Sequence, residues 1–477
     1  MRPRDRWMLA GGRWSQGTGQ DAYTMTDPAT GEPLGVVAVS APADVAAAVA
    51  AACDAAPGWA ATPAADRGAA LHAAARAVEE RVDELAALVT AEMGKPSGDA
   101  LGGVEAGIAT LRQYAELGPL HGGRSLQGGW RAADFMVREP RGVVAVITPW
   151  NDPVAIACGL IGAALATGNT VVHKPSERTP HTGAMLAELL DDRLPDGVLN
   201  MVTGDGATGE ALAGHPDTDV VAHVGSTAAG RRVAELALRT GARTLLENGG
   251  CDPLVVDGDV DPGWAAEQAA LGCFANAGQI CTSVERVYVH EAVAEPFLEA
   301  LADRARALRM GPGAEVSTEL GPLVDERHRT HVHQQVEKAI ADGARALTGA
   351  RIPDGPGAFY PATVLAGCAD HMPIMAEEVF GPVAPVRTVA SFDHALDAAR
   401  RSRHGLAATV LTRDMAHAQA AWRTLNVGTV KINAVFGGAP GGAAEPRRGS
   451  GRGFGYGPEL LDEMTKVKAV HVQTDVP

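Results

Sequence analysis

Apolar residues recur at helical spacing through an alanine-rich stretch that spans residues 44–93. Within this stretch Thr62 and Pro63 supply a helix cap followed by a proline, which suits the first turn of a new helix. Gly94, Lys95 and Pro96 come next, and they predict a helix end, because glycine closes helices and proline cannot extend them. The amino-terminal part of the chain therefore predicts a helical layer.

Beyond Arg141 the hydrophobic pattern changes to short apolar runs separated by segments of helix length. Such runs are typical of buried strands in a parallel sheet whose crossover connections are helices. The candidate strands are residues 143–147, 170–173, 198–202, 220–224 and 244–246. A second alternating region runs from Asp252 to about Val435, so the pattern predicts two successive α/β units.

Polar or glycine-rich residues follow each candidate strand. They are Trp150 and Asn151, the run Lys174-Pro175-Ser176-Glu177, Gly204 to Gly206, Gly225 to Thr227, and Glu247. In open α/β sheets ligands bind at the carboxyl ends of the strands, so these residues are expected to share one crevice. Residues 225–230 also open a predicted helix whose first N–H groups suit a phosphate, with a simple tight turn as the alternative.

Glycine dominates the stretch from Phe436 to Gly457, which also carries Arg447, Arg448 and Arg452. Glycine at this density disfavours regular structure, so we expect a loop-rich segment that lines or covers a site. One hypothesis is that the arginines recruit a carboxylate, phosphonate or phosphate group of a substrate. The alternative is a solvated loop without that role.

One thiol stands out, Cys281 in the run Phe274-Ala-Asn-Ala-Gly-Gln-Ile-Cys281-Thr-Ser. Small residues precede it, and a thiol presented in this way is a candidate nucleophile, although free cysteines are more often small buried hydrophobes. Upstream, Glu247 follows an apolar run and stands close to two glycines. A thiol and a carboxylate together suggest covalent catalysis followed by hydrolysis.

The chain has 477 residues, of which 46% are hydrophobic and 21% charged, and this predicts a globular protein of two or three domains. Its net charge of −16 disfavours binding to a nucleic-acid backbone, which needs a cationic face. No uninterrupted apolar run is long enough for a membrane helix. Gly11, Gly12 and Arg13 interrupt any stretch of signal-peptide type, so we expect a cytoplasmic protein with neither nucleic-acid nor membrane partners.

The six cysteines are scattered along the chain. They are Cys53, Cys158, Cys251, Cys273, Cys281 and Cys368. None forms a C-x-x-C pair or a Cys/His cluster with zinc spacing, so we expect neither a metal site nor a disulfide framework. The pattern predicts reduced thiols, of which at most one need be reactive.

The residues with distinctive chemistry also occur in one order along nearly the whole chain. They are Trp150-Asn151, Lys174-Pro-Ser-Glu177, Gly225-Ser-Thr, Glu247-x-Gly-Gly, Gly278-Gln-x-Cys281 and Glu378-x-Phe380-Gly-Pro, with Glu92-Met-Gly-Lys-Pro96 and Gly405-Leu-Ala-Ala408 as further matches. With these motifs the chain resembles the NAD(P)-dependent aldehyde dehydrogenase superfamily.

The resemblance implies an α/β fold with three parts. A Rossmann-like parallel-sheet domain would bind the dinucleotide (residues 1–119 and 140–246), and a second α/β domain would be catalytic (247–445). A small β oligomerisation arm and the C-terminal tail would occupy residues 120–139 and 446–477. Because exposed strand edges in such an arm invite pairing with another subunit, we expect a homodimer or homotetramer.

The same resemblance assigns catalytic roles to three residues. Cys281 would attack the carbon of the aldehyde to form a thiohemiacetal. The side-chain amide of Asn151 and the backbone N–H of Cys281 would form the oxyanion hole. After hydride passes to NAD(P), Glu247 would activate the water that hydrolyses the resulting thioester to a carboxylic acid.

Eight further residues are implied to bind the cofactor. They are Trp150, Lys174, Ser176, Glu177, Gly225, Ser226, Glu378 and Phe380. Lys174 and Glu177 would contact the adenosine ribose, while Glu378 and Phe380 would hold the nicotinamide ribose and ring. A carboxylate at Glu177 would repel a 2′-phosphate, so we expect NAD, with NADP as the alternative.

Departures from the family pattern bear on the substrate. Asp152 follows Asn151 where an aromatic or bulky apolar residue is common, and in a substrate funnel it would disfavour acidic aldehydes. Arg447 and Arg448 would favour acidic ones. An aromatic content of only 4% favours a small polar aldehyde over a bulky aromatic one. After Glu247, Asn248 stands where leucine is usual.

Other functions fit parts of the sequence. A CoA-acylating relative would pass the thioester to coenzyme A and has no need of Glu247. A catalytically silent scaffold would not require Cys281, Asn151 and Glu247 together. A cysteine amidase is disfavoured because no histidine lies near Cys281 in the sequence. The predicted function is therefore the hydrolytic oxidation of an aldehyde.

Overall fold

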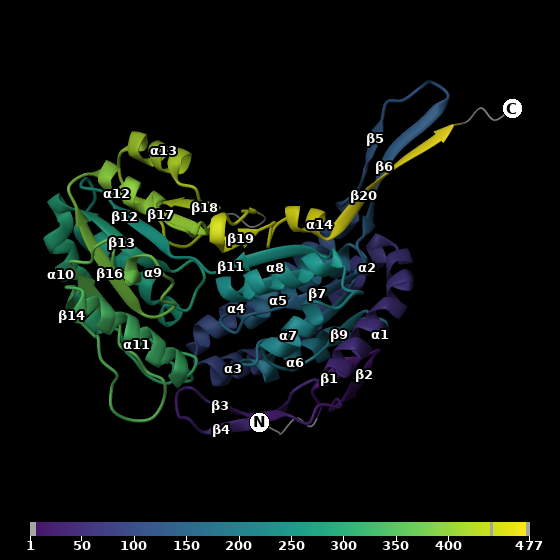
Figure 1. Cartoon of the computed structure of the whole chain (residues 1–477), viewed down its shortest axis with the longest axis horizontal. Helices are drawn as coiled ribbons and strands as arrows, with labels where there is room; N and C mark the ends of the chain where they lie inside the picture. Colours follow the sequence, from purple (N-terminus) through teal and green to yellow (C-terminus); the bar gives the residue numbers. More distant parts are fainter. Residues whose placement is uncertain (1–5, 439–441, 474–477) are drawn as a thin grey trace.

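The computed structural model describes residues 6–438 and 442–473. The chain forms two α/β bodies, each built on its own sheet, and a slender arm that projects from one of them (Figure 1). The chain passes between the bodies at the end of β11 (Arg243–Asn248), which is followed directly by β12 (Asp252–Val256) of the second sheet. The two α/β units predicted from the hydrophobic pattern are thus confirmed.

The first sheet has eight strands in the order β19-β11-β10-β7-β8-β9-β1-β2. Their bounds, besides those of β11, are β1 (Met8–Ala10), β2 (Arg13–Ser15), β7 (Val143–Ile147), β8 (Thr170–Lys174), β9 (Leu199–Met201), β10 (Val220–Gly225) and β19 (Gly451–Arg452). The five central strands run parallel, and they confirm the five candidate strands of the sequence. Helices cover both faces, which is why β7 and β8 are wholly buried.

Eight helices in the described part of the chain belong to this body. They are α1 (Pro42–Ala61), α2 (Ala64–Glu79), α3 (Val82–Met93), α4 (Ser97–Leu117), α5 (Pro153–Ala166), α6 (Pro180–Asp191), α7 (Gly206–Ala213) and α8 (Thr227–Thr240). The first three confirm the predicted helical layer, and α3 ends where Gly94 adopts a φ of 81°, a left-handed value that glycine tolerates. The helix α5 is apolar on all sides because it lies buried within this body.

The second sheet has seven strands in the order β14-β15-β16-β13-β12-β17-β18. The strands besides β12 are β13 (Val284–His290), β14 (Arg345–Thr348), β15 (Thr363–Ala366), β16 (Val383–Val389), β17 (Ala407–Leu411) and β18 (Thr429–Ile432), and the helices are α9 (Pro262–Phe274), α10 (Glu291–Ala307), α11 (Glu326–Ala341), α12 (Phe392–Arg400) and α13 (Met415–Thr424). Of these seven strands, the edge strand β14 alone runs antiparallel to its neighbour.

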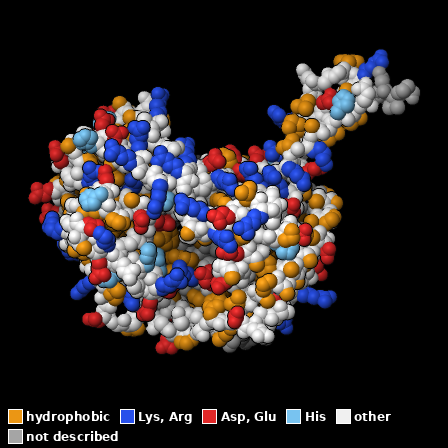
Figure 2. All heavy atoms as spheres, viewed as in Figure 1, with side chains coloured by type: hydrophobic (Ala, Val, Ile, Leu, Met, Phe, Trp, Pro, Cys, Tyr) orange, Lys and Arg blue, Asp and Glu red, His pale blue; other side chains and the backbone are white. Residues whose placement is uncertain are grey.

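The arm consists of β5 (Arg124–Leu126), β6 (Ala132–Pro140) and β20 (Thr465–Gln473). The strand β20 follows the short helix α14 (Glu459–Glu463) and pairs antiparallel with β6 along its whole length. Residues 120–139 and the C-terminal tail thus both contribute strands to the arm. Hydrophobic side chains remain uncovered along the arm (Figure 2), and Trp130 at its turn is fully exposed. A hairpin of β3 (Ala22–Thr26) and β4 (Pro33–Ala38) packs against the first body.

Within the described ranges, no single helix is long and apolar enough to cross a membrane. The pair α1 and α2 would meet the length and hydropathy criteria together, but the two helices are bent by 120° at their junction.

Candidate active site

A cavity of about 250 Å³ lies where the carboxyl edge of the eight-stranded sheet meets the second body. All three residues predicted to be catalytic line this cavity. Asn151 follows β7, Glu247 stands near the end of β11, and Cys281 lies in the loop that precedes β13. The structure thus brings together three groups that are far apart in sequence.

A second cavity of about 400 Å³ continues from the first along the carboxyl ends of β7, β8 and β10. The two cavities share Trp150, Arg178, Gly225 and Ser226 as wall residues. Lys174, Ser176 and Glu177 line the second cavity, whereas Glu378 and Phe380 line the first. Every residue predicted to bind the cofactor therefore lies along one continuous groove that ends at the thiol.

The loop before Cys281 has an unusual backbone. Asn276, Ala277 and Gly278 all have positive φ, at 49°, 54° and 72°, a conformation that residues with side chains rarely adopt. A β-carbon at Gly278 would collide with the carbonyl oxygen of Gly381, so only glycine lets these two loops meet. The strained residues directly precede the segment that presents the thiol, as is common at functional sites.

Hydrogen bonds fix this loop around one carbonyl group. The side-chain amides of Asn151 and Asn276 both donate to the backbone oxygen of Gln279, at 3.1 and 3.2 Å. The buried amide of Gln279 donates to the oxygen of Asn276 and accepts from the backbone N–H of Val324. Asn151 is thereby held beside Cys281 by its own Nδ2 group, which is the group predicted to donate to an oxyanion.

The Cys281 side chain is partly exposed to the cavity, while the walls around it exclude most water. Burial raises the pKa of this thiol to about 12, and the carboxylates of Glu247, Asp252 and Glu378 contribute to the rise. At neutral pH the sulfur is therefore a neutral thiol in the cofactor-free protein. A positive charge placed in the cavity would lower the pKa and favour the thiolate.

Glu247 is held by the glycine-rich tail rather than by its neighbours in sequence. Its Oε1 atom accepts a hydrogen bond of 3.0 Å from the backbone N–H of Gly455. A β-carbon at residue 455 would stand 2.5 Å from Glu247 Cγ, so a larger residue there would have to displace the Glu247 side chain. Burial raises the pKa of Glu247 to about 8, although the Gly455 hydrogen bond acts in the opposite direction. A carboxyl with this pKa can exchange a proton near neutral pH.

The tail makes two more contacts with the strand end that carries Glu247. The side chain of Asn248 donates to the carbonyl oxygen of Gly449, and Ser450 Oγ donates to the oxygen of Gly249 at 2.8 Å. These bonds explain the departure at residue 248, because leucine could not make the first one. Residues 449–455 of the tail thus support the strand end that carries Glu247, although none of them lines the cavity, and residues 439–441 lie outside the described part of the chain.

Glu285 is a functional candidate that the sequence reasoning missed. Its buried carboxylate accepts hydrogen bonds from the backbone N–H groups of Val379 and Phe380, at 3.0 and 2.8 Å. Phe380 has a φ of 52°, so Glu285 holds a strained turn in place. Burial and the nearby charge of Glu378 raise the pKa of Glu285 well above its usual range. The sequence offered one signal for Glu285: it is a carboxylate only four residues after the candidate nucleophile Cys281, near the start of β13.

Three aromatic rings form one wall of the cavity. Trp150, Phe380 and His328 pack edge to face, with centroids between 5.4 and 6.2 Å apart. The guanidinium of Arg178 lies over Trp150 and forms an ion pair of 2.8 Å with Asp325. Arg178 and His328 were not among the predicted residues, although Arg178 directly follows the Lys174–Glu177 motif.

The second cavity has the groups that a dinucleotide requires. The ring of the buried His223 lines this cavity. Within the described residues, neither of its nitrogens forms a hydrogen bond with another side chain. The N-terminus of α8 opens beside it, where Ser226 caps the helix. Lys174 Nζ lies 3.8 Å from the carboxylate of Glu177. These donors and acceptors fit the phosphates and ribose hydroxyls of NAD(P).

The three residues predicted to contact the substrate lie elsewhere. Asp152 points to the buried Lys95, with 3.3 Å between Oδ1 and Nζ, so its charge is offset. Arg448 donates to the backbone oxygens of Arg400 and Ser402, and Arg447 donates to the side chain of Asn426. None of the three lines the cavity. Their placement does not support the predicted substrate contacts, and the two arginines instead fasten the tail to the second body.

Comparison with known proteins agrees with this geometry. Residues 14–470 match the model of the aldehyde dehydrogenase family. The chain is 35% identical to a mitochondrial aldehyde dehydrogenase of Leishmania tarentolae, over 97% of this chain and 94% of the relative. It superposes with a TM-score of 0.96 on lactaldehyde dehydrogenase from Escherichia coli, at 31% identity over 99% of this chain and 100% of that one.

It also superposes with a TM-score of 0.96 on betaine aldehyde dehydrogenase from Staphylococcus aureus in complex with NAD⁺, at 30% identity over 99% of this chain and 95% of that one. The chain belongs to the aldehyde dehydrogenase family. It is an oxidoreductase that oxidises aldehydes with NAD(P), which confirms the family, the fold and the reaction class predicted from the sequence.

Proposed function

We propose that this protein oxidises a small polar aldehyde to its carboxylic acid, with Cys281 as nucleophile, Asn151 as oxyanion donor and Glu247 as general base. One observation carries the proposal: these three side chains line a single cavity at the end of a groove that suits a dinucleotide. A structural role for any one of them would not require all three to face the same space.

In the first step the sulfur of Cys281 forms a bond to the carbonyl carbon, and the carbonyl electrons move onto the oxygen. The Nδ2 group of Asn151 and the backbone N–H of Cys281 donate to that oxygen as its charge develops. The proton of the thiol must leave, since burial and carboxylates keep it neutral at rest. When bound, NAD⁺ would supply a positive charge beside the sulfur and would accept the hydride that leaves the carbon of the adduct, so that the carbonyl re-forms as a thioester.

In the second step Glu247 takes a proton from a water molecule, whose oxygen attacks the carbon of the thioester. The bond between that carbon and the sulfur then breaks, so that the carboxylic acid leaves and the thiol is restored. The raised pKa of Glu247, about 8, suits this work, because a base with a pKa near the working pH both accepts and releases a proton readily.

The rest of the groove supports roles for the remaining residues. Lys174, Ser176 and Glu177 would hold the adenosine ribose, and a carboxylate at residue 177 favours NAD over NADP because it repels a 2′-phosphate. Gly225 and Ser226, at the start of α8, would face the pyrophosphate. Glu378, Phe380 and Trp150 would enclose the nicotinamide end.

The substrate class follows from the size and chemistry of the cavity. Its volume of about 250 Å³ must hold the nicotinamide end as well as the aldehyde, which leaves room for only a small substrate. Lys95 offsets the negative charge of Asp152, so Asp152 does not select for or against a charged aldehyde. A similar protein acts on lactaldehyde, which is small and hydroxylated, and this supports a small polar substrate here.

The test uses single turnovers of two variants. With Cys281→Ala we expect no NADH formation while NAD binding persists. With Glu247→Gln we expect a burst of about one NADH per active site followed by an acyl-enzyme that intact-mass spectrometry detects. Free turnover of Glu247→Gln without an adduct would contradict the role of Glu247. Acyl-CoA formation without free acid, when coenzyme A is added, would establish the CoA-acylating reaction instead.

The proposal extends to assembly and location. The uncovered apolar residues of the arm, Trp130, Val467 and Val472 among them, support a homodimer or homotetramer. All six cysteines are unpaired, which supports a reducing compartment such as the cytoplasm. Sedimentation at micromolar concentration tests the assembly, and a strict monomer would contradict it. Cell fractionation tests the location.

A further inference from the structure

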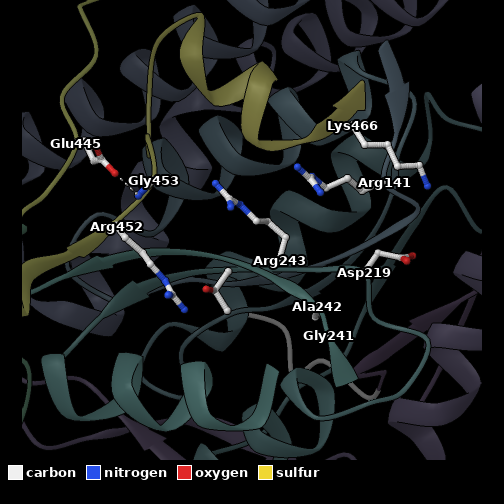
Figure 3. Close-up of a pocket in the computed structure, with 10 residues that line it drawn as sticks. Arg141, Asp219, Gly241, Ala242, Arg243, Glu445, Arg452, Gly453 and Lys466 are labelled. Atoms are coloured by element: carbon white, nitrogen blue, oxygen red, sulfur yellow. Dashed lines mark hydrogen bonds between the residues drawn. The ribbon is translucent and has the colours of Figure 1, made fainter. Parts of the chain in front are cut away.

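The two edges of the eight-stranded sheet carry different chemistry. Figure 3 shows four cations that lie in a row at the amino edge, namely Arg452, Arg243, Arg141 and Lys466. The carboxylates of Glu463 and Asp219 offset part of the charge of Arg141. Lys466 lies in β20 of the arm, which is proposed to pair with a second subunit. The amino edge therefore fits assembly, whereas the carboxyl edge holds the cofactor groove.

The hairpin of β3 and β4 reaches a residue of this groove through one tyrosine. Tyr23, on β3, donates its hydroxyl to the backbone oxygen of Glu177 at 2.9 Å, across 154 positions of sequence. Glu177 lines the cofactor groove, and its carboxylate is the group proposed to contact the adenosine ribose. The hairpin is thus joined directly to a proposed cofactor residue, although Tyr23 itself does not line the groove.

Tyr23 is firmly held on its own side of this contact. Its ring packs against a small buried cluster to which β1, β4, α6 and β9 contribute. Its backbone pairs with Val37 of β4. Burial raises the pKa of Tyr23, and the nearby carboxylates of Glu177, Glu92 and Asp205 raise it further, so the hydroxyl keeps its proton and remains a donor.

The turn that carries Glu177 is anchored where it enters α6. The buried carboxylate of Glu92, from α3, accepts hydrogen bonds of 2.8 Å from the backbone N–H groups of His181 and Thr182, in the first turn of α6. It also accepts from the side chains of these two residues, at 2.8 and 2.7 Å. A carboxylate at this position suits the positive end of the helix. The far end of the turn therefore cannot move easily.

Glu177, between this anchor and the end of β8, has weaker support. Its side chain is 46% exposed and lies 3.8 Å from Lys174 Nζ, a distance at which an exposed ion pair contributes little. Ser176 Oγ is 3.5 Å from the carboxylate. Within residues 6–438 and 442–473, the hydroxyl of Tyr23 is the only hydrogen-bond donor to the Glu177 carbonyl. Tyr23 thus makes the shortest polar contact that fixes Glu177.

We propose that Tyr23 is a positioning residue for the cofactor: it holds the backbone of Glu177, so that the carboxylate stays where it binds the ribose hydroxyls of NAD and repels the 2′-phosphate of NADP. The inference rests on the ribose role of Glu177 in the proposed function. Because the same carboxylate acts on the two cofactors in opposite directions, Tyr23 influences the choice between them as well as the affinity for NAD.

The test is Tyr23→Phe, which removes the hydroxyl and keeps the ring. Isothermal titration calorimetry of the full chain with NAD and with NADP, in the absence of aldehyde, measures binding without turnover. We expect the Kd for NAD to rise by about fivefold, as for the loss of one hydrogen bond, and the Kd for NADP to stay the same or fall. A damaged fold would weaken both cofactors alike, and an equal loss for both would overturn the proposal.

Tyr114→Phe is the matched control. The hydroxyl of Tyr114 also donates to a backbone carbonyl, that of Gly457, at 3.3 Å, and neither residue lines the two cavities of the groove. Both Kd values should stay at the parent level in this variant. A change of cofactor preference in Tyr114→Phe as large as in Tyr23→Phe would overturn the proposal, because the effect would not depend on Glu177.

A double variant shows whether Tyr23 acts through Glu177. In the background of Glu177→Ala, which lacks the carboxylate, Tyr23→Phe should change neither Kd further. A second fivefold loss of NAD affinity in this background would overturn the proposal, and so would unchanged Kd values in Tyr23→Phe alone. If Glu177→Ala itself left the affinity for NAD unchanged, the ribose role of Glu177 would fall with it. An effect of Glu177→Ala without one of Tyr23→Phe would overturn only the role of Tyr23.

Discussion

Cys281 and Glu247 face the same cavity, but the contacts that hold them come from different distances along the chain. The loop of Cys281 is shaped by hydrogen bonds among its close sequence neighbours Asn276 and Gln279 as well as by more distant contacts, such as that of Asn151 with Gln279. Glu247 is held by Gly455, and the strand end around it is held by Gly449 and Ser450, about two hundred positions away.

The difference suggests that the two halves of the reaction depend on different parts of the molecule. Formation of the thioester needs the strained loop and the Asn151 amide, which the two bodies provide at their junction. Its hydrolysis needs a carboxylate whose position depends on the glycine-rich tail. A change in the tail should therefore slow hydrolysis while leaving the thiol accessible, and a change in the loop should impair both halves.

The largest effect is expected from Gly278→Ala. The new β-carbon would collide with the oxygen of Gly381 and would also strain a φ of 72°. We expect the free energy of unfolding to fall by about 3 kcal/mol and activity to fall by about a hundredfold, because the thiol moves relative to its partners. Urea denaturation and steady-state kinetics measure the two effects.

Gly241→Ala is the matched control for that change, since Gly241 has a φ of 81° but no atom lies within 4 Å of the position that a β-carbon would take. It should cost only the conformational strain, about 1 kcal/mol, with activity preserved. Equal losses in the two variants would mean that contact with Gly381 does not shape the thiol loop.

A smaller and more selective effect is expected from Gly455→Ala. A β-carbon 2.5 Å from Glu247 Cγ would displace the carboxylate that activates water. We expect hydrolysis of the acyl-enzyme to slow by about tenfold, which corresponds to a carboxylate shifted but not removed. The NADH burst and alkylation of Cys281 by iodoacetamide should stay close to the parent values. Gly122→Ala, at a glycine with open space, is the control. Slower alkylation of Gly455→Ala would show that the tail supports the thiol too.

The pH dependence separates the two groups without mutation. Glu247 must be ionised to accept a proton, and its pKa is about 8, so hydrolysis should fall by about tenfold for each pH unit below 7 and level off above 9. Alkylation of the cofactor-free thiol, whose pKa is about 12, should keep rising through pH 10. Single-turnover hydrolysis and iodoacetamide labelling from pH 6 to 10 give both profiles. Coincident profiles would contradict the separate titration of the two groups.

The smallest effect is expected from Glu285→Gln, which tests a residue that links the two loops. The amide oxygen of glutamine can accept only one of the two N–H groups of Val379 and Phe380 with good geometry, so the turn that carries Glu378 and Phe380 should loosen. We expect the KM for NAD to rise by about fivefold with little change in thiol alkylation, which corresponds to the loss of about one hydrogen bond. An unchanged KM for NAD together with slower alkylation would place its role at the thiol loop instead.

The sequence alone indicated the parallel strands, the helical layer and the ends of many elements, because these depend on local hydrophobic periodicity and on glycine and proline. It also indicated Asn151, Glu247 and the cofactor residues from Trp150 to Ser226, because their motifs stand at predicted strand ends where parallel sheets bind ligands. Cys281 was indicated by its small neighbours and by the family resemblance, and Glu378 and Phe380 by the resemblance alone. Asp152, Arg447 and Arg448 were assigned to the substrate from their charge alone. Their partners, Lys95, Asn426 and the backbone of residues 400–402, are distant in sequence.

Only the tertiary structure decided that Gly455 holds Glu247, that Glu285 holds the turn at Phe380, and that four cations meet at the amino edge of the first sheet. Each of these contacts joins segments that are far apart in the sequence, and the distance along the chain does not determine which segments meet in space. Sequence motifs indicate which side chains can act in catalysis or binding, and hydrophobic periodicity indicates which side chains face a core. Which of them meet is set by how the sheets, the tail and the arm pack, and that packing minimises the exposure of apolar surface over the whole chain.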